Sequence, residues 1–163
     1  MAVRGRGRGG NPSRGARRAL EQAETAYSEF DPDRDPSPLW MDWFSPARLA
    51  GFKGNTLLAA GQGARARETL RQVLEDLPPE AIKQRAVVLA DLAAAEVLEH
   101  EPERACDLLD EALQILGEHW YATAMDRVKA VRQSLRAWDS LPQVRELDNQ
   151  LYNWHTMIKS LTV

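Results

Sequence analysis

The sequence predicts an all-α fold of about seven helices that pack as antiparallel pairs. Ala, Leu, Glu and Arg, the strongest helix formers, dominate the chain from Ala16 onward. Val and Ile are few and scattered, so no run of strands is indicated. The third observation is an internal repeat with a period of about 39 residues, which places Ala66, Ala105 and Val144 in the same register.

The expected helices follow from apolar periodicity and from turn signals. The first begins near Ala16 and stops at Asp31-Pro32, where a proline-rich loop follows. The second begins at Ser45-Pro46, because an N-cap residue followed by proline marks a helix start. Glycine and proline signals then define five more helices, over about 63–77, 81–98, 101–117, 121–138 and 142–158. The segment 81–98 is apolar on nearly all sides, so we expect it to be the central, buried helix.

The charge is distributed unevenly along the chain. The first eighteen residues hold six arginines and no acid, which leaves 15 basic and 24 acidic residues in the remainder, a net charge of −9. An acidic body repels phosphates, so we expect no direct DNA binding from the helical part. The glycine- and arginine-rich residues 1–15 lack apolar periodicity and are expected to form a disordered tail, followed by one helical domain over 16–163.

Residues for catalysis or metal binding are not found in any known pattern. The three histidines, His100, His119 and His155, share no helical spacing, and neither HExxH, CxxC nor a GxxxxGK[ST] phosphate loop occurs. Cys106 is the only cysteine, which excludes an intramolecular disulfide, and we expect it to be buried. We therefore predict no enzyme activity, no cofactor and no metal. The sequence has no secretory signal and no apolar run long enough to span a bilayer, so a cytoplasmic location is predicted.

The repeat has a recognisable pattern of small and bulky residues. Gly54 and Ala93 occupy one register position in the first helices of their units, and a small residue at a helix contact lets two backbones approach closely. The second helices carry a small residue, a bulky residue four positions later and an apolar residue three further on: Ala66, Leu70 and Val73, then Ala105, Leu109 and Ala112. This pattern, closed by Pro78, resembles the tetratricopeptide repeat (TPR). The resemblance implies a TPR-like solenoid of about three helix pairs with an extra N-terminal helix. In the third unit Arg132 and Asp148 depart from the pattern, which is typical of a capping repeat.

A second resemblance covers residues 16–151. The segments LAGFKGNTLLAAGQGARARETLRQVLEDLP, RAVVLADLAAAEVLEHEPERACDLLDEAL and VRQSLRAWDSLPQVRELDNQL are similar to the C-terminal TPR-like half of actinobacterial Xre-type helix-turn-helix transcriptional regulators. In that family a DNA-binding domain precedes the repeat half, whereas here residues 1–15 stand in its place. The resemblance implies a non-catalytic sensory or interaction module that lacks its DNA reader.

The repeat register also predicts a binding surface. Solenoids bind partners on the concave surface that the first helix of each unit lines. The outward positions are Arg48 and Asn55 in the first unit, Val87, Ala90, Ala94 and Val97 in the second, and Asp126, Lys129, Gln133 and Arg136 in the third. An apolar strip between polar groups suits a peptide or a partner helix. Asn55 and Gln133 share one register position, and their side-chain amides are suited to grip an extended peptide backbone.

Three other interpretations stay open at this stage. The predicted binding residues also fit ordinary solvated helix positions. The arginine-rich tail resembles nucleic-acid-binding segments in composition but lacks interleaved aromatic residues, so it fits either a nucleic-acid contact or a solvated tail. The uncovered apolar end of a short solenoid would also permit a homodimer.

Overall fold

The computed structural model describes residues 12–29 and 46–160, and this part of the chain contains helices and no strand. The elements in order are α1 (Pro12–Ser28), α2 (Pro46–Ala59), α3 (Gly63–Asp76), α4 (Ile82–Leu98), α5 (Pro102–Glu118), α6 (Ala122–Ser134), the 3₁₀ helix η2 (Leu135–Trp138) and α7 (Pro142–Ser160). The predicted all-α class is confirmed. The expected loop before Ser45 and most of the expected tail lie outside the described residues, while α1 begins at Pro12, four residues before the expected start.

The turns between helices repeat as well. Gly61, between α2 and α3, has a φ of 68°, and His100, which occupies the same register position between α4 and α5, has a φ of 60°. Both helices therefore end with a left-handed residue, the usual way to terminate an α-helix. The helix expected over 121–138 differs at its end, because α6 stops at Ser134 and η2 continues to Trp138. A tighter 3₁₀ turn at the C-terminus of a helix is common.

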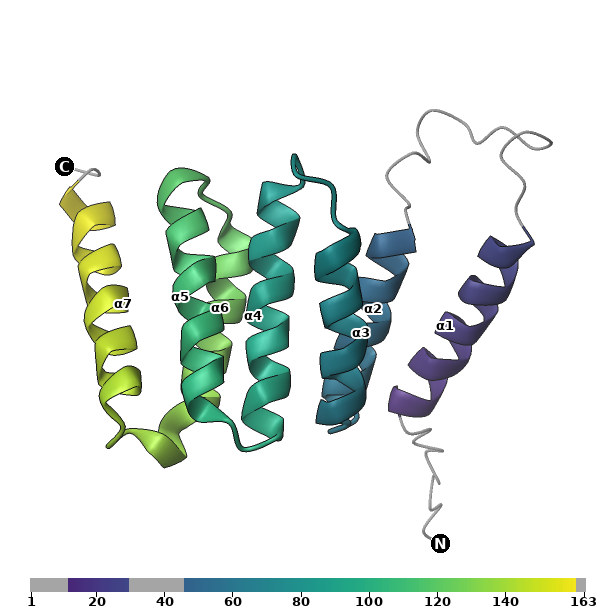
Figure 1. Cartoon of the computed structure of the whole chain (residues 1–163), viewed down its shortest axis with the longest axis horizontal. Coiled ribbons are helices and arrows are strands. Elements are labelled where there is room, and N and C mark those ends of the chain that lie inside the picture. The colour runs from purple at the N-terminus through teal and green to yellow at the C-terminus, as the bar shows by residue number, and fades with distance from the viewer. Residues whose placement is uncertain (1–11, 30–45, 161–163) are drawn as a thin grey trace, which may run out of the picture.

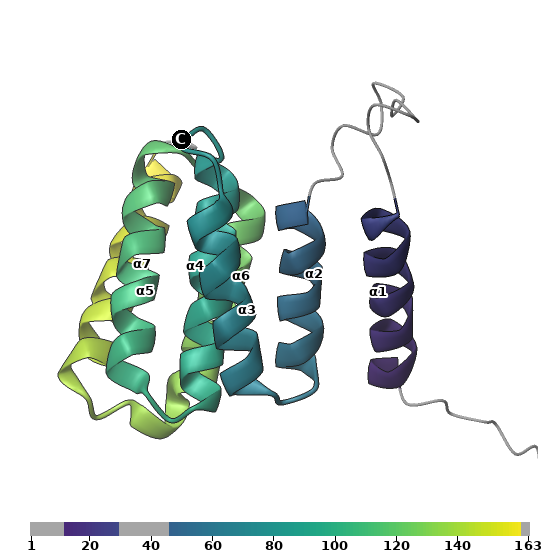
Figure 2. The same cartoon turned by 45° about the vertical axis from the view of Figure 1, so that its right-hand side comes forward.

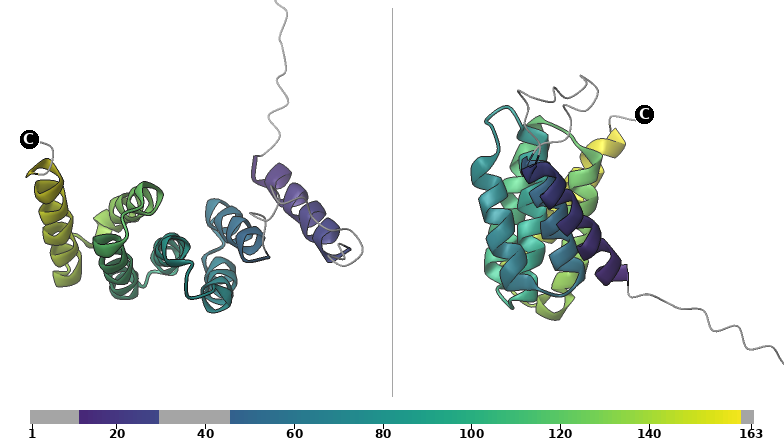
Figure 3. Two further views of the ribbon diagram at one scale, coloured as in Figure 1. Left: turned by 90° about the horizontal axis from the view of Figure 1, so that it is seen from above. Right: turned by 90° about the vertical axis from the view of Figure 1, so that its right-hand side faces the viewer.

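Consecutive helices pack against one another along the chain (Figure 1). The contacts run from α2 to α3, from α3 to α4 and from α4 to α5, and α2 and α6 both contact α4. The rotated view in Figure 2 shows α1 at one end of this row, beside α2. Seen from above, α2 and α6 lie on one side of the molecule, α3 and α5 lie on the other, and α4 lies between them in contact with all four (Figure 3). The final helix, α7, packs chiefly on α5.

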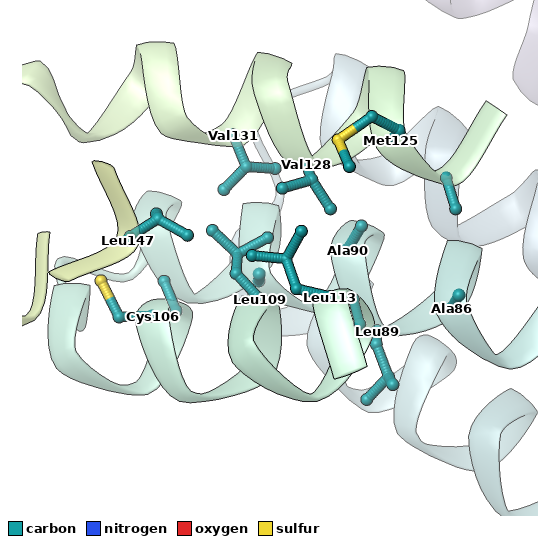
Figure 4. Close-up of a cluster of buried hydrophobic side chains, with 14 of the residues drawn as sticks. Ala86, Leu89, Ala90, Cys106, Leu109, Leu113, Met125, Val128, Val131 and Leu147 are labelled. Carbon is teal, nitrogen blue, oxygen red and sulfur yellow. The ribbon is translucent and has the colours of Figure 1, made fainter. Parts of the chain in front are cut away.

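The hydrophobic core forms two clusters that meet at α4. Ten of the 17 residues of α4 are buried, which confirms the prediction of a central helix. Leu92 of α4 packs in the smaller cluster with residues of α2 and α3, and Leu89 packs in the larger cluster with residues of α5, α6 and α7. Figure 4 shows part of the larger cluster, including Leu109 and Val128. Since α4 contributes to both clusters, it holds the two halves of the molecule together.

The 39-residue register is visible in the packing of the second helices. Ala66 of α3, Ala105 of α5 and Val144 of α7 are all completely buried. The three positions therefore perform the same packing role, and the described helices form a helical repeat.

The crossing between the helices of a pair also repeats. A Cβ atom on Gly54 would lie 2.5 Å from Cδ2 of Leu70. One unit later, the equivalent residues Ala93 and Leu109 are both completely buried in the larger cluster. In the third unit the equivalent residues are Arg132 and Asp148, and they form a direct ion pair. These two charged side chains span the crossing in the third unit, where α7 packs chiefly on α5.

Candidate functional site

A polar network built from one residue of each helix joins α2, α4 and α6. Nδ2 of Asn55 donates a hydrogen bond to Oδ2 of Asp91 at 2.9 Å. Nη1 of Arg127 donates to Oδ1 of Asp91 and to Oδ1 of Asn55. The three side chains link the first helices of all three pairs.

Asp91 is the buried centre of this network. Its exposed fraction is 4%, whereas Arg127 keeps 36% of its side chain exposed. Burial raises the pKa of Asp91, and the Arg127 guanidinium and the Asn55 amide oppose this rise by stabilising the carboxylate. The carboxylate is held where desolvation disfavours it, so its two partners are required to keep it in place.

The contacts between neighbouring first helices are displaced by about one helical turn from the repeat register. Asn55 and Asp91 are 36 residues apart, and so are Asp91 and Arg127. This spacing is about three residues shorter than the repeat, and three residues make nearly one turn on the same helix face. The repeat register alone pairs Asn55 with Gln133, whereas the structure engages the Asn55 amide with Asp91 and Arg127.

The other predicted binding residues lie at the surface. Arg48 on α2, Asp126, Lys129 and Gln133 on α6, and Arg136 on η2 are all exposed. The apolar strip predicted for the middle unit is narrower than expected. Ala90 and Val97 are buried in the larger cluster because α4 has neighbours on nearly every side, while Val87 and Ala94 are only partly buried. The prediction that Ala90 and Val97 line an open surface is therefore wrong.

A second buried carboxylate joins α3 to α4. Glu96 is 1% exposed and accepts hydrogen bonds from Arg67 at 3.3 Å and from Arg71 at 3.1 Å. Sequence analysis named neither Glu96 nor Asp91, although both are acids inside the most apolar segment of the chain. An acid in such a helix is a usable signal, because a buried carboxylate requires a cationic or hydrogen-bonding partner.

The last helix is fastened by a third polar cluster. Arg132 donates two parallel hydrogen bonds to Asp148, at 2.6 and 2.7 Å, and a further contact joins it to Asp139 at 2.9 Å. Hydrogen bonding to Arg132 lowers the pKa of Asp148. The bidentate geometry is the strong form of this interaction, so it fixes where α7 lies relative to α6.

Cys106 reports on the docking of α7. Its thiol is buried in the same cluster as Leu147 of α7, and the two lie near each other in Figure 4. Burial, together with the nearby Asp107 carboxylate, raises the pKa of the thiol from 9.0 to about 11. Since thiolate is the reactive form, the folded protein is expected to protect Cys106 from modification.

At pH 8 we expect a disulfide reagent such as DTNB to modify Cys106 about 100-fold more slowly in the folded protein than in urea, because a pKa rise of two units lowers the thiolate fraction by about that factor. An Asp148→Asn variant should react faster than the parent, because the ion pair that fastens α7 is weakened while Arg132, whose charge lowers the pKa of the thiol, stays in place. The two proteins should react equally in urea. Equal rates for the folded and unfolded parent would contradict a buried thiol.

The described residues contain no group of three or more histidine, cysteine or acidic side chains that could hold a metal ion. None of the helices in that same part of the chain has the length and hydrophobicity that crossing a membrane requires. Comparisons of the chain with protein-family models, with curated proteins and with solved structures find no match. The function therefore has to be argued from the geometry.

Proposed function

We propose that the chain is a TPR-like helix-pair solenoid that works as a non-catalytic binding module for a protein or peptide. The observation that carries the proposal is the repeated arrangement of the helix pairs. The first helices α2, α4 and α6 contact one another in that order. The second helices α3, α5 and α7 bury equivalent residues, namely Ala66, Ala105 and Val144. Repeats of this kind build extended surfaces from the first helices of successive units. The sequence resemblance supports a regulatory role, as the sensor or interaction half of an Xre-type transcriptional regulator.

The polar network gives this surface a fixed shape. Asp91 is hydrogen-bonded to both neighbouring first helices, so α2 and α6 cannot shift along α4 without breaking a bond to a buried carboxylate. A surface that is rigid before binding loses less conformational entropy when the partner arrives. In this proposal Asn55, Asp91 and Arg127 set the positions of the three first helices, and exposed residues of α6 and η2 contact the partner.

The exposed residues of α6 and η2 give the proposed partner its chemistry. Lys129 on α6 and Arg136 on η2 are both exposed and both basic, with Gln133 between them in the sequence. Asp126 adds an acceptor one turn before Lys129. We propose that the partner is an extended peptide or a helix that presents acidic groups to Lys129 and Arg136.

Panning a random-peptide display library against the full chain tests this function. Peptides that the parent selects should bind a Lys129→Glu/Arg136→Glu variant at least about tenfold more weakly, because reversed charges turn attraction into repulsion. The matched control is Arg104→Glu, an equally exposed charge reversal on α5, in the row of second helices. Failure to select any peptide, or selected peptides that lose equal affinity in both variants, would contradict binding through α6 and η2.

One observation favours a second candidate, a nucleic-acid contact through the arginine-rich N-terminal segment. Arg14, Arg17 and Arg18 are all exposed on α1, and their spacing of three and four residues places them on one helix face. Contacts of this kind weaken steeply with salt, and removing residues 1–18 would abolish them. Peptide binding at Lys129 and Arg136 would survive that deletion.

A further inference from the structure

A groove between α5 and α7 has no role in the surface described above. Its volume is about 310 Å³, and its wall includes Asp110, Leu113 and Gly117 of α5 with Gln150 and Trp154 of α7. It lies beside the last helix pair and away from α2 and α4. An inference about this groove therefore stands or fails independently of the proposed function.

The indole of Trp154 forms part of the wall, and a second indole extends it. The rings of Trp120 and Trp154 are 5.6 Å apart between centroids and tilted by 33°. Trp120 lies in the short turn between α5 and α6 and keeps 47% of its surface exposed. A half-exposed indole pair at the wall of a groove offers a flat, electron-rich face to a ligand.

The groove wall carries a negative charge. Among the described residues that form the wall, Asp110 is the only charged one, and one oxygen of this carboxylate accepts a hydrogen bond from Gln150. The same helix has a strong acidic excess, with one arginine, Arg104, against five acids: Glu103, Asp107, Asp110, Glu111 and Glu118. A carboxylate beside an indole is the setting that a guanidinium suits best, since it stacks on the ring and donates parallel hydrogen bonds to the carboxylate.

The chain itself carries a segment of matching chemistry. Residues 1–11, MAVRGRGRGGN, lie outside the described part and contain Arg4, Arg6 and Arg8, separated by single glycines, and no acid. Glycine has no side chain beyond hydrogen, so arginine between glycines can enter a narrow groove with little steric conflict from its neighbours. The charge and the small neighbouring residues of this segment thus suit the groove.

The same molecule is poorly placed to fill its own groove. The segment joins α1, which lies at the opposite end of the helix row from α7 (Figure 1). The row between them takes about three to four helix spacings of roughly 8–10 Å each, or about 30 Å. Eleven residues reach at most about 36–40 Å when fully extended, so few would remain to bind. A second copy is free of this restriction.

We propose that the groove between α5 and α7 binds the arginine–glycine segment 1–11 of a second copy of this chain. One arginine stacks on the Trp120–Trp154 pair and pairs with the Asp110 carboxylate. Two copies can exchange their segments reciprocally, which produces a dimer held by two identical contacts.

Sedimentation velocity of the full chain over a concentration series at low salt tests this proposal. We expect a reversible dimer that weakens as salt rises, because the contact pairs opposite charges near the protein surface. A tail variant, Arg4→Gln/Arg6→Gln/Arg8→Gln, should dimerise at least about tenfold more weakly, as expected when charge-assisted hydrogen bonds are lost. Two groove variants, Asp110→Asn and Gly117→Leu, should have the same effect.

Gly117→Leu is chosen because it should fill the groove and leave the fold intact. A Cβ atom at Gly117 would make ordinary contact with Trp154, at 3.8 Å, so a side chain at this position of the groove wall begins without a clash. Circular dichroism should show unchanged helix content for both groove variants. Their melting temperatures should also stay close to that of the parent.

Mixing the tail variant with a groove variant is the decisive arm. Each is defective alone, but one supplies an intact groove and the other an intact tail. The mixture should therefore form a heterodimer, which a fluorescent label on one partner detects. The proposal is overturned if the parent stays monomeric at millimolar concentration, if it dimerises equally well with either defect, or if mixing restores nothing.

Discussion

Replacing Arg127 by methionine is expected to lower the free energy of unfolding by about 2–3 kcal/mol, because Asp91 then keeps a buried charge with Asn55 as its one remaining partner. The loss should fall below that of a fully buried pair, since Arg127 is about one-third exposed. Urea denaturation at pH 7, followed by circular dichroism, measures the change.

A double variant separates the charge from the packing. Adding Asp91→Leu to Arg127→Met removes the stranded carboxylate, so the double variant should recover most of the lost stability. Simple additivity of the two losses would contradict the idea that Arg127 acts through Asp91. The exposed reversal Arg104→Glu is the control, and we expect it to change stability little.

The pH dependence of this effect has a defined sign. The pKa of Asp91 is raised by burial, so the folded state binds the proton more tightly than the unfolded chain does, and the ionised carboxyl reduces stability above that pKa. Arg127→Met removes a group that lowers this pKa. Its destabilisation should therefore be largest near neutral pH and should shrink as the pH falls through the raised pKa of Asp91.

The sequence predicted the second helices of the repeat better than the first. Ala66, Ala105 and Val144 were placed in one register from spacing alone, and all three are completely buried. Positions in a tight crossing depend mainly on local spacing along two consecutive helices. Such local constraints are the part of a helical fold that sequence patterns carry best.

The first helices were harder to interpret because their contacts are displaced from the repeat. Asn55, Asp91 and Arg127 follow one another at steps of 36 residues, three fewer than the repeat. This difference arises from the relative orientation of neighbouring units. The burial of Ala90 and Val97 has the same origin, since it depends on helices from both neighbouring units. A periodic sequence pattern contains no information on the relative orientation of neighbouring units.

The departure at Arg132 and Asp148 was visible in the sequence, but its meaning came from the geometry. Both residues interrupt the small and bulky pattern of the first two units, and the sequence suggested only a terminal unit. In the structure Arg132 takes the position of Gly54 and Ala93, and Asp148 takes the position of Leu70 and Leu109. The two departures therefore meet at the same helix crossing. Two polar exceptions at equivalent positions of paired helices are thus a signal for an ion pair.

The glycines of α2 provide the sharpest test of the crossing. We expect Gly54→Ala to lower the free energy of unfolding by about 1–3 kcal/mol, because its Cβ atom would lie 2.5 Å from Cδ2 and 2.7 Å from Cγ of Leu70. Leu70 is completely buried, so moving away from the new Cβ atom requires displacing neighbouring core atoms. Thermal or urea denaturation of the full chain measures the loss.

Gly51 is the matched control, one turn earlier on the same helix. No atom lies within 4 Å of the position that its Cβ would occupy, so Gly51→Ala meets no obstacle and should raise the free energy of unfolding by about 0.5–1 kcal/mol through helix propensity. The same substitution three residues apart is thus expected to have opposite signs. A Leu70→Ala change should relieve the conflict, so that Gly54→Ala costs less in that background than in the parent. If both glycine substitutions stabilised the protein, the close approach of α2 and α3 at Gly54 would be refuted, and with it the crossing on which the repeat is built.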